Sequence, residues 1–361
     1  MKDRLCVGVV GSGIISEIYI RNMTTRFPNL WVKAVASKHL DHAKKRAAEF
    51  GLSAATVEEL FADPEIDLIV NLTPVGAHYE IVKAALLAGK HVYSEKTLTD
   101  SPETAAELLK LAGEKGLYLG AAPDTFLGAG IQAARGVIDS GRIGKVTGFA
   151  VTANRNWEAL MNWFPFLQEK GAGMCYDFAV YHLTAVLSML GPVSEVAAFA
   201  VQPGPYRHLI PDAPDYGKPY ICPNETQVSA ILKLQSGVTG TLMMDGDCIT
   251  KESPVLRIYG TNGILEFGDP NKFGEPVRVM LEEKDWRTEA FADVPLTSEY
   301  ADNSRGLGVS EMAAAILSGT KSRVDAHLAC HVLDVLSAML QSSAENRFVK
   351  VCSTFDLPLP M

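Results

Sequence analysis

The sequence lacks a long apolar run and a basic cluster. No stretch approaches the roughly 20 apolar residues of a membrane-spanning helix, and the first four residues lead straight into a strand pattern rather than the apolar core of a signal peptide. The net charge is -9, which argues against the basic face that nucleic-acid phosphates require. We therefore expect a cytoplasmic protein with neither nucleic acid nor membrane as a partner.

Cysteine is scarce and scattered, because its six copies form no CxxC pair. This pattern favours reduced thiols over disulfides. One group near the C-terminus has the helical spacing of metal ligands, but it lies on an apolar helix pattern that is more typical of packing. We expect no metal site at its members, which are His327, Cys330, His331 and Asp334.

The stretch Leu5 to Ser16 (LCVGVVGSGIIS) predicts a strand, a glycine turn and a helix start. Glycines let the backbone approach a pyrophosphate, whose charge meets N–H groups at the helix N-terminus. A second strand, Trp31 to Ala36, follows at the spacing of a dinucleotide fold. The predicted nucleotide contacts in this turn are Gly11, Ser12, Gly13, Ile14 and Ile15.

Strand and helix patterns alternate through the first third of the chain. Repeated β-α units predict an α/β fold with a doubly wound parallel sheet, whose ligand lies at the carboxyl ends of the strands. We assign residues 1–122 to this Rossmann domain. The expected helices are 41–50, 56–61, 78–88 and 102–115, and the later strands are 67–72, 91–94 and 117–121.

The pattern changes after residue 122. Apolar and polar residues alternate with period two over 227–234, and turns at 236–237 and 261–263 join such segments as hairpins. We expect residues 123–361 to form an α+β domain with a largely antiparallel open sheet and helices on one side. Its predicted helices are 126–140, 309–317 and 326–344, and a further strand is 146–153.

Several motifs, in order along the chain, resemble the Gfo/Idh/MocA oxidoreductase family, whose namesakes are glucose-fructose oxidoreductase and inositol dehydrogenase. They are the glycine turn, Asn71-Leu72-Thr73-Pro74 with His78, Ser94-Glu95-Lys96, Ala122-Pro123-Asp124-Thr125-Phe126, residues 171–191, Asp269-Pro270-Asn271 and Arg305-Gly306-Leu307-Gly308.

The resemblance implies a Rossmann domain that binds NAD(P) and a second domain whose sheet makes homodimer or homotetramer contacts. It implies hydride transfer between the nicotinamide and a CH–OH group of a small, carbohydrate-like substrate such as a sugar, polyol or cyclic alcohol. Two other functions stay open within this resemblance: a redox-assisted, NAD-dependent glycosidase, and a nucleotide-binding regulator without catalysis.

Lys96 is the predicted proton-transfer residue. It follows a buried strand at the carboxyl end, and a desolvated lysine can have a pKa low enough to exchange a substrate proton. The family's Glu-Lys signature implies the same role for it. The family usually continues with proline, whereas this chain has Thr97, so the local constraint of a proline ring is missing.

Asp177, Tyr181 and His182 form the second catalytic group. In a helix, Asp177 and Tyr181 share a face and His182 is turned about 100° away. The resemblance implies a histidine four residues after the aspartate, and tyrosine occupies that position here, as in some relatives. We expect Tyr181 to transfer the proton with Asp177 orienting the groups, and His182 remains the alternative.

The end of the second strand bears on the choice of cofactor. Ser37 and Lys38 offer a hydroxyl and a cation, and no carboxylate follows until Asp41. This favours NADP, whose 2′-phosphate a basic residue can receive, while NAD remains possible. The resemblance adds further positions along the cofactor, namely Thr73, Pro74, His78, Glu95 and Lys96.

Two aromatic stretches have two possible roles each. Trp157, Trp163, Phe164 and Phe166 could pack on a sugar ring or belong to the core. The loop from Gln202 to Cys222 could form a lid or an oligomer arm.

Overall fold

A computed structural model describes residues 2–168, 172–202, 204, 206–207, 216–220, 222–248, 255–281 and 290–361. The chain divides into two compact units. The first comprises Met1–Gly128, Asp302–Cys330 and Met361, and the second comprises Ala129–Ala301 and His331–Pro360. The first unit therefore recruits residues 302–330, which the sequence analysis assigned to the second domain.

The first unit contains the predicted doubly wound parallel sheet. Its six strands are all parallel and lie in the order β3-β2-β1-β4-β5-β6. The strand order reverses between β1 and β4, which is where ligands bind in such sheets. The strands are β1 (Leu5–Val10), β2 (Leu30–Ala36), β3 (Ser53–Ala55), β4 (Leu68–Asn71), β5 (His91–Ser94) and β6 (Leu119–Ala121).

The helices of the first unit begin and end at residues with recognisable capping chemistry. The Ser101 hydroxyl accepts a hydrogen bond from the Thr104 N–H, and Pro102 is the first helical residue, as predicted. Gly51 and Gly116 end two helices in the left-handed conformation. The helices are α1 (Ile14–Thr25), α2 (Leu40–Phe50), α3 (Val57–Ala62), α4 (His78–Leu87), α5 (Pro102–Lys115) and α9 (Leu307–Ser318).

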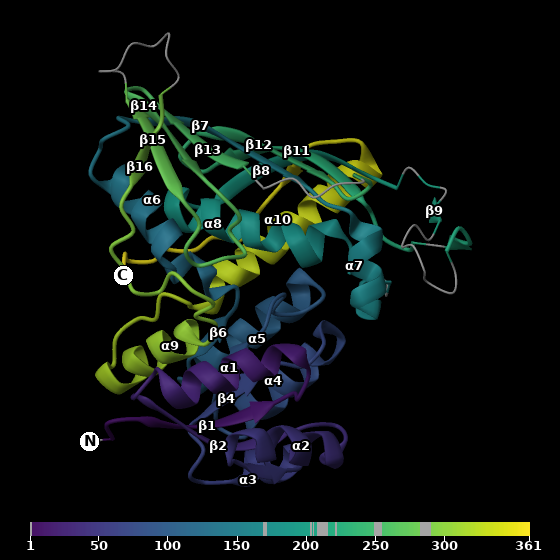
Figure 1. The fold of residues 1–361 in the computed structure, drawn as a ribbon, viewed down its shortest axis with the longest axis vertical. Coiled ribbons are helices and arrows are strands. Elements are labelled where there is room, and N and C mark those ends of the chain that lie inside the picture. Colours follow the sequence, from purple (N-terminus) through teal and green to yellow (C-terminus); the bar gives the residue numbers. More distant parts are fainter. Residues whose placement is uncertain are drawn as a thin grey trace. The chain divides into compact units, whose positions relative to one another are not determined.

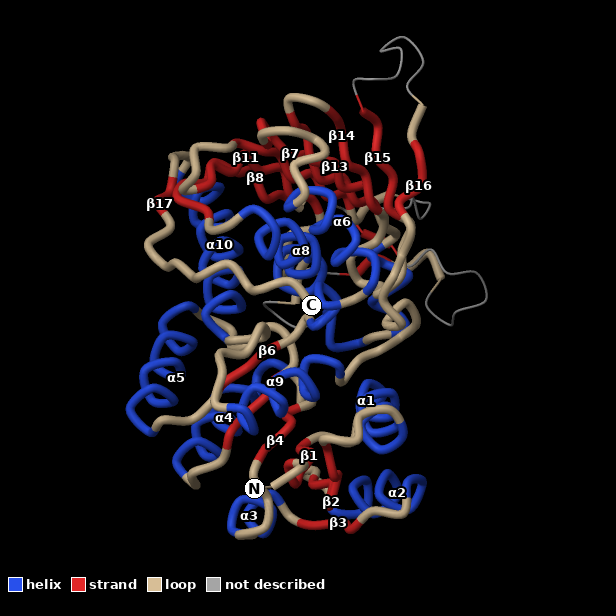
Figure 2. The backbone as a smooth tube through the Cα atoms, turned by 90° about the vertical axis from the view of Figure 1, so that its left-hand side faces the viewer, coloured by secondary structure: helices blue, strands red, loops and turns tan. Residues whose placement is uncertain are grey.

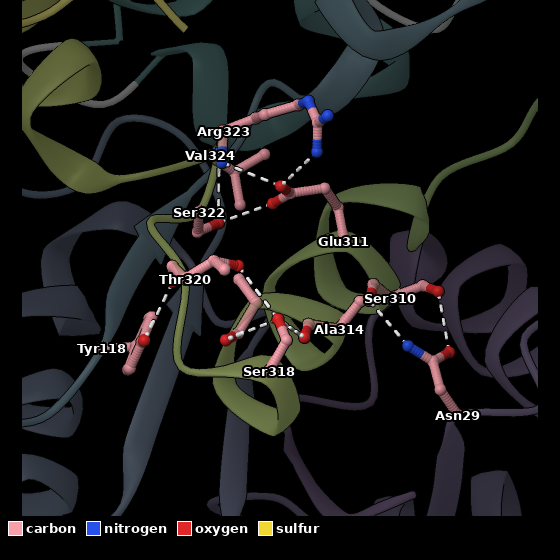
Figure 3. Close-up of polar contacts among 11 residues, drawn as sticks. Asn29, Tyr118, Ser310, Glu311, Ala314, Ser318, Thr320, Ser322, Arg323 and Val324 are labelled. Atoms are coloured by element: carbon pink, nitrogen blue, oxygen red, sulfur yellow. Dashed lines mark hydrogen bonds and ion pairs between the residues drawn. The ribbon is translucent and has the colours of Figure 1, made fainter. Parts of the chain in front are cut away.

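Residues 302–330, which we call the strap, are fastened to the first unit by paired hydrogen bonds (Figure 3). The Asn29 amide donates to the Ser310 carbonyl at 2.8 Å, and the Ser310 hydroxyl donates back to the Asn29 amide oxygen at 2.8 Å. Tyr118 donates its hydroxyl proton to the Thr320 carbonyl at 2.9 Å. Side chains next to the parallel sheet thus hold a segment 202 to 281 residues away in sequence.

The strap also continues the sheet at β6. The Ala121 N–H donates to the Val324 carbonyl at 3.1 Å. The buried carboxylate of Glu311 accepts from the Ser322 hydroxyl and from the Arg323 N–H, which fixes the turn before this pairing (Figure 3). The pairing satisfies backbone groups at a strand edge, which explains why the strap belongs to the first unit.

The second unit is built on the predicted large sheet. Nine strands lie in the order β16-β15-β14-β13-β7-β12-β11-β8-β17, and every pair is antiparallel except β7 with β12. Both predicted hairpins form, between β11 and β12 and between β13 and β14. The strands are β7 (Val146–Asn154), β8 (Val193–Val201), β11 (Gln227–Leu234), β12 (Thr239–Asp245), β13 (Val255–Gly260), β14 (Gly263–Phe267), β15 (Val277–Leu281), β16 (Ala292–Val294) and β17 (Val349–Lys350), beside a separate pair, β9 (Tyr206–Arg207) and β10 (Pro219–Tyr220).

Helices of the second unit gather on one face of this sheet (Figures 1 and 2). They are α6 (Ala129–Asp139), α8 (Val180–Leu190) and the residues of α10 (Ala326–Glu345) that belong to this unit, while α7 spans Trp157–Trp163. The predicted helix 126–140 is wrong at its start, because Gly128 is extended and separates α6 from a 3₁₀ turn at Asp124–Leu127.

The opposite face of the sheet carries exposed apolar side chains. Phe199, Ile231 and Met243 are 66%, 56% and 49% exposed, and they come from the neighbouring strands β8, β11 and β12. We call these three residues the open face. Alternation along each strand places them opposite the core.

No helix in the described part of the chain is long and apolar enough to cross a membrane. Among the same residues, no three His, Cys, Asp or Glu side chains come together as a metal site would require. The expectations of a cytoplasmic location and of a protein without metal stay predictions.

Candidate active site

The glycine turn after β1 is packed between the ends of two neighbouring strands. Gly11 has a φ of +111°, and a Cβ placed on it would lie 2.6 Å from the Leu72 carbonyl group at the end of β4. Its N–H donates to the Ala36 carbonyl at the end of β2, at 2.9 Å. Both the backbone conformation and the contact with Leu72 therefore require glycine here.

The second glycine of the turn faces open space instead. Gly13 is the N-cap of α1, and a Cβ built on it would meet no atom within 4 Å. Ile14 is 79% exposed, and the Ser16 hydroxyl donates a hydrogen bond to the Gly13 carbonyl at 2.7 Å. The first N–H groups of a helix point out of its end, so the turn fits a diphosphate held by the N–H groups of Gly13, Ile14 and Ile15 beside the half-buried Ser12.

Around the predicted adenosine end, the structure adds one residue that the sequence analysis missed. Ser37 is half-buried and Lys38 is exposed after β2, and Asp41 is exposed at the start of α2. Arg46, on α2, donates to the Gly13 carbonyl at 3.4 Å. Only the packing of α2 beside the glycine turn reveals Arg46, because nothing in its local sequence marks it.

The loops after β4 and β5 are joined by buried polar contacts. The Asn71 amide donates to the Ser94 hydroxyl at 3.0 Å, and its oxygen accepts from the Thr73 hydroxyl at 2.7 Å. The His78 ring is buried, with Nδ1 2.7 Å from the Thr97 carbonyl and Nε2 2.7 Å from the Thr73 carbonyl. One histidine thus connects the loop after β4 to the loop after β5.

His78 was predicted to lie along the cofactor, next to Thr73 and the exposed Pro74. Both of its ring nitrogens lie 2.7 Å from backbone carbonyls, and a neutral imidazole has one N–H, so the ring donates to one of the two carbonyls and contacts the other. Burial lowers the pKa of its imidazole. The structure therefore gives His78 the task of joining two loops, and any contact with the nucleotide stays a prediction.

Glu95 and Lys96 follow β5 and are both half-buried. The Glu95 N–H donates to the Asn71 carbonyl at 2.9 Å, and the Lys96 N–H donates to Glu95 Oε2 at 3.0 Å. The second carboxylate oxygen, Oε1, accepts from the Tyr19 hydroxyl at 2.8 Å. The backbone that carries Lys96 is thereby bonded to β4 and to helix α1.

Thr97 occupies the position where the family usually has proline. The Lys96–Thr97 peptide bond is cis. The Thr97 hydroxyl is buried and donates to the Thr99 carbonyl at 2.8 Å, while the Thr97 carbonyl contacts His78. This segment lacks the constraint of a proline ring, and hydrogen bonds from two sides hold it instead.

In the second unit, Asp177 lies in a π-helical segment, Met174–Ala179, that runs directly into α8. Asp177 and Tyr181 are half-buried, whereas His182 is completely buried. His182 Nδ1 contacts the Phe178 carbonyl at 3.0 Å, and Nε2 has no hydrogen-bond partner in the described part of the chain. Burial lowers the pKa of His182 to about 4.

Solvent exposure distinguishes Tyr181 from His182, the two candidates that the sequence analysis left open for proton transfer. Tyr181 reaches the surface one turn after Asp177, and His182 points into the core as a neutral imidazole. A proton-transfer residue has to come within hydrogen-bond reach of its substrate. Burial thus favours Tyr181, and its catalytic role stays a prediction.

A half-buried carboxylate from a distant loop anchors the segment that carries Asp177. Glu225 Oε1 accepts from the Cys175 N–H at 2.9 Å. A Cβ on Gly173 would lie 2.2 Å from the same oxygen, so only glycine leaves room for this carboxylate. The sequence analysis missed Glu225, since 50 residues separate it from its partner.

Two further observations concern the end of β7. Arg155 places its guanidinium 4.4 Å from the centre of the Phe178 ring, a cation–π contact that the sequence analysis also missed. Trp157 is 1% exposed and belongs to the core, whereas Phe164 and Phe166 are 38% and 44% exposed. The Trp163 side chain and most of the loop from Gln202 to Cys222 lie outside the described residues.

A parallel sheet with a glycine turn at its switch point defines the class of Rossmann dinucleotide-binding proteins. Comparison with protein families specifies this class further. Residues 5–122 match the model of the oxidoreductase family with an NAD-binding Rossmann fold, and residues 131–266 match the GFO/IDH/MocA C-terminal domain. The chain belongs to the Gfo/Idh/MocA family of oxidoreductases.

Individual relatives are distant. An uncharacterized oxidoreductase of Schizosaccharomyces pombe is 30% identical over 53% of each chain, so the match spans about half of that relative's length. The scyllo-inositol 2-dehydrogenase (NADP(+)) IolW of Bacillus subtilis is 22% identical over 96% of each chain. A levoglucosan dehydrogenase structure in complex with NADH is 20% identical, with a TM-score of 0.83 over 97% of this chain and 100% of that one, and this likeness shows the fold.

Proposed function

We propose that this oxidoreductase is an NADP-preferring dehydrogenase or reductase acting on a CH–OH group of a sugar, polyol or related cyclic alcohol. The observation that carries the proposal is the position of Lys96. This half-buried residue follows β5, directly beside the sheet's switch point, and its backbone is bonded to Glu95. The names of the inositol and levoglucosan dehydrogenases support the substrate class.

The nucleotide would be held by the glycine turn, from Gly11 to Ile15, with its adenosine end near Ser37 and Lys38. A bound nicotinamide dinucleotide supplies the hydride acceptor or donor. Lys96 takes the hydroxyl proton when the substrate is oxidised and returns it when the carbonyl is reduced. The bonds through Glu95 and Thr97 restrict the positions available to its amine, so less ordering is needed at the moment of reaction.

The second unit contributes the groups that recognise the substrate. We assign Tyr181 a donor and acceptor role toward a substrate hydroxyl, and Asp177 the orientation of these groups. Glu225 keeps their helical segment in place. Replacement of Tyr181 by Phe and of His182 by Asn tests the assignment, because we expect turnover to fall in the first variant and protein stability to fall in the second.

The first experiment is a titration of the protein with NADPH and NADH, followed by nicotinamide fluorescence. We expect tighter and reversible NADPH binding, and the Lys38→Ala variant should lose about tenfold in NADPH affinity, the value of one charge-assisted hydrogen bond. Lys44→Ala, on the helix α2 that follows Lys38, is the control. Tighter NADH binding would contradict the NADP assignment, and nucleotide that does not exchange would favour the glycosidase reaction.

The role of Lys96 is tested with a Lys96→Met variant on a panel of inositols, levoglucosan and hexoses. We expect turnover to fall by at least about 100-fold, as for loss of a general base. The dissociation constant for NADPH should change less than about threefold, well within the 1.4 kcal/mol that a tenfold change represents. Lys110→Met, an exposed control on α5, should behave as wild type. Full turnover by Lys96→Met would refute the mechanism.

We further propose that the chain forms a homodimer or homotetramer through the open face. Phe199, Ile231 and Met243 lie side by side on three strands and are about half exposed or more. Contiguous apolar surface of this kind marks interaction sites. Light scattering after chromatography should show an oligomer that Ile231→Glu dissociates. A monomeric wild-type protein would contradict this proposal.

A further inference from the structure

One partly buried hydrogen bond connects helix α1, at the glycine turn, to the segment that carries Lys96. Tyr19 lies on α1, within two turns of the glycine turn, and its side chain is 0% exposed. Its hydroxyl donates to Glu95 Oε1 at 2.8 Å. The other oxygen of the same carboxylate accepts from the backbone N–H of Lys96 at 3.0 Å. Helix α1 and the Lys96 backbone therefore share one carboxylate.

The environment of Tyr19 makes its hydroxyl a permanent donor. Its ring packs against Tyr93 with centroids 6.4 Å apart, a contact that phenylalanine would make equally well. Burial and the nearby Glu95 charge raise the pKa of Tyr19 well above its usual value, so the hydroxyl keeps its proton. A buried hydroxyl is unfavourable unless it is bonded. The Tyr19 ring is needed for packing, and its hydroxyl is needed for the hydrogen bond to Glu95.

We propose that Tyr19 is a positioning residue, which through Glu95 holds Lys96 in the place it needs for proton transfer. The proposal rests on the function given above for Lys96. It extends that function by coupling two tasks: the helix whose N-terminus faces the nucleotide diphosphate also fixes the carboxylate beside the proton-transfer lysine. A nucleotide seated on α1 would then find the Lys96 segment already placed.

A Tyr19→Phe variant tests the proposal by removing one oxygen atom. We expect kcat to fall ten- to hundredfold, the order of effect seen when a reacting group is slightly misplaced. The KM for substrate and the dissociation constant for NADPH should stay within about threefold of wild type, since no binding contact is lost. Tyr118→Phe, which loses a hydroxyl bonded to the strap, is the matched control and should keep its kcat.

A second readout does not depend on turnover. The rate at which an amine-reactive reagent labels Lys96, read by peptide mass spectrometry, reports the surroundings of its amine directly. We expect this labelling rate to change at least about threefold in Tyr19→Phe, which is a free-energy change well below the 1.4 kcal/mol of a tenfold change but still measurable. Labelling of Lys110 in the same sample should not change.

A double-mutant cycle shows whether Tyr19 acts through Glu95. Glu95→Gln removes the carboxylate charge, and the bond from Tyr19 to a neutral amide is weaker. The kcat effect of Tyr19→Phe should therefore shrink clearly in the Glu95→Gln background, whereas independent effects would multiply.

The outcomes separate this inference from the function on which it rests. Altered Lys96 labelling in Tyr19→Phe without any wild-type turnover would support the positioning link and refute the function. Loss of activity in Lys96→Met, combined with unchanged kcat and unchanged labelling in Tyr19→Phe, would overturn the positioning role alone. A Tyr19→Phe protein that is merely less stable, with kcat intact, would also overturn it.

Discussion

The two units hold their candidate site residues in different ways. In the first unit, side chains connect neighbouring loops and elements, as Asn71 does with Ser94, His78 with the carbonyls of two loops, and Tyr19 with Glu95. In the second unit, Glu225 contacts the helical segment that carries Asp177 at two places: its carboxylate accepts from the Cys175 N–H, and its backbone carbonyl accepts from the Met174 N–H. The loops after β4 and β5 are thus joined by side chains of several elements, whereas Glu225 contacts the Asp177 segment through both its side chain and its backbone.

Burial shifts the pKa values of carboxyl and imidazole groups in opposite directions. In the first unit, Asp124 is buried and accepts the N–H groups of Gly306 and Gly308 on the strap, and burial raises its pKa to about 6. In the second unit, burial lowers the pKa values of His182 and His331 to about 4. Over the same acidic range, these groups change the stability of their units in opposite directions.

The largest effect is expected at the glycine turn, where one substitution should destabilise the fold and its neighbour should mainly weaken nucleotide binding. Gly11→Ala should lower the free energy of unfolding by about 3–5 kcal/mol, because it adds left-handed strain to a contact with the Leu72 backbone. Denaturant unfolding measures this loss. Gly13→Ala is the matched variant and should lower stability by at most about 1 kcal/mol, because alanine is a poorer N-cap residue than glycine.

Gly13→Ala should nevertheless weaken NADPH binding on the order of tenfold, since its Cβ would fill the space in front of α1. Fluorescence titration gives this value. If Gly11→Ala folds as stably as wild type, or Gly13→Ala unfolds as readily as Gly11→Ala, the packing described for this turn is wrong.

The pH dependence of each unit follows from its buried groups. The neutral form of His331 accepts the Val193 N–H, so its contribution is complete above pH 6.5 and is lost as the pH falls through 4. From the size of the pKa shift, the loss is on the order of 3 kcal/mol. Hydrogen exchange resolved by peptide should show this loss in the second unit, and His331→Gln should reduce the slope.

Asp124 should act in the opposite sense. Because its pKa is raised in the folded state, the stability it contributes is present below pH 3.8 and is lost as the pH rises through 6. Asp124→Asn should flatten that part of the pH profile in the first unit only. His39→Asn, at an exposed position, is the control for both variants and should leave both profiles unchanged.

A smaller effect tests the contact between Glu225 and the segment that carries Asp177. Gly173→Ala would place a methyl group against the Glu225 carboxylate and should lower stability by about 1–3 kcal/mol. Gly136→Ala, in α6 with no atom within 4 Å, should raise stability by about 0.5–1 kcal/mol. Thermal unfolding distinguishes the two. Equal stability of the two variants would mean that Glu225 does not anchor this segment.

Local patterns predicted most strands of the first sheet, and β7 and the two hairpins of the second sheet, because each of these patterns is typical of one backbone conformation. The sequence analysis gave no range for β8, β15, β16 or β17. The apolar run Leu5–Val10 is buried along its whole length and forms β1, and the alternation over 227–234 forms β11 with one face in the core. Ser101 with Pro102 marked a helix start, and Gly51 and Gly116 marked helix ends. The break at Gly128 was missed because an extended glycine leaves no trace in helical periodicity.

Long-range contacts determine which unit the strap belongs to and which partners Glu225 and Tyr19 have, and local sequence patterns could not predict either. The strap joins the first unit because Asn29 and Ala121 bond to residues about 200 to 280 positions later. Glu225 and Tyr19 gained their roles in the same way, from partners 50 and 76 residues distant. Local sequence carries no signal for such pairs.

The sequence by itself determined the Rossmann sheet, the glycine turn, the mostly antiparallel second sheet and the oxidoreductase family, because backbone conformation and the spacing of apolar residues and motifs depend on positions close in the chain. The tertiary structure alone decided that His182 is buried while Tyr181 reaches the surface, that His78 joins two loops, and that Tyr19 shares a carboxylate with Lys96. Those facts depend on which distant groups meet when the chain folds, and solvent exposure is settled only then.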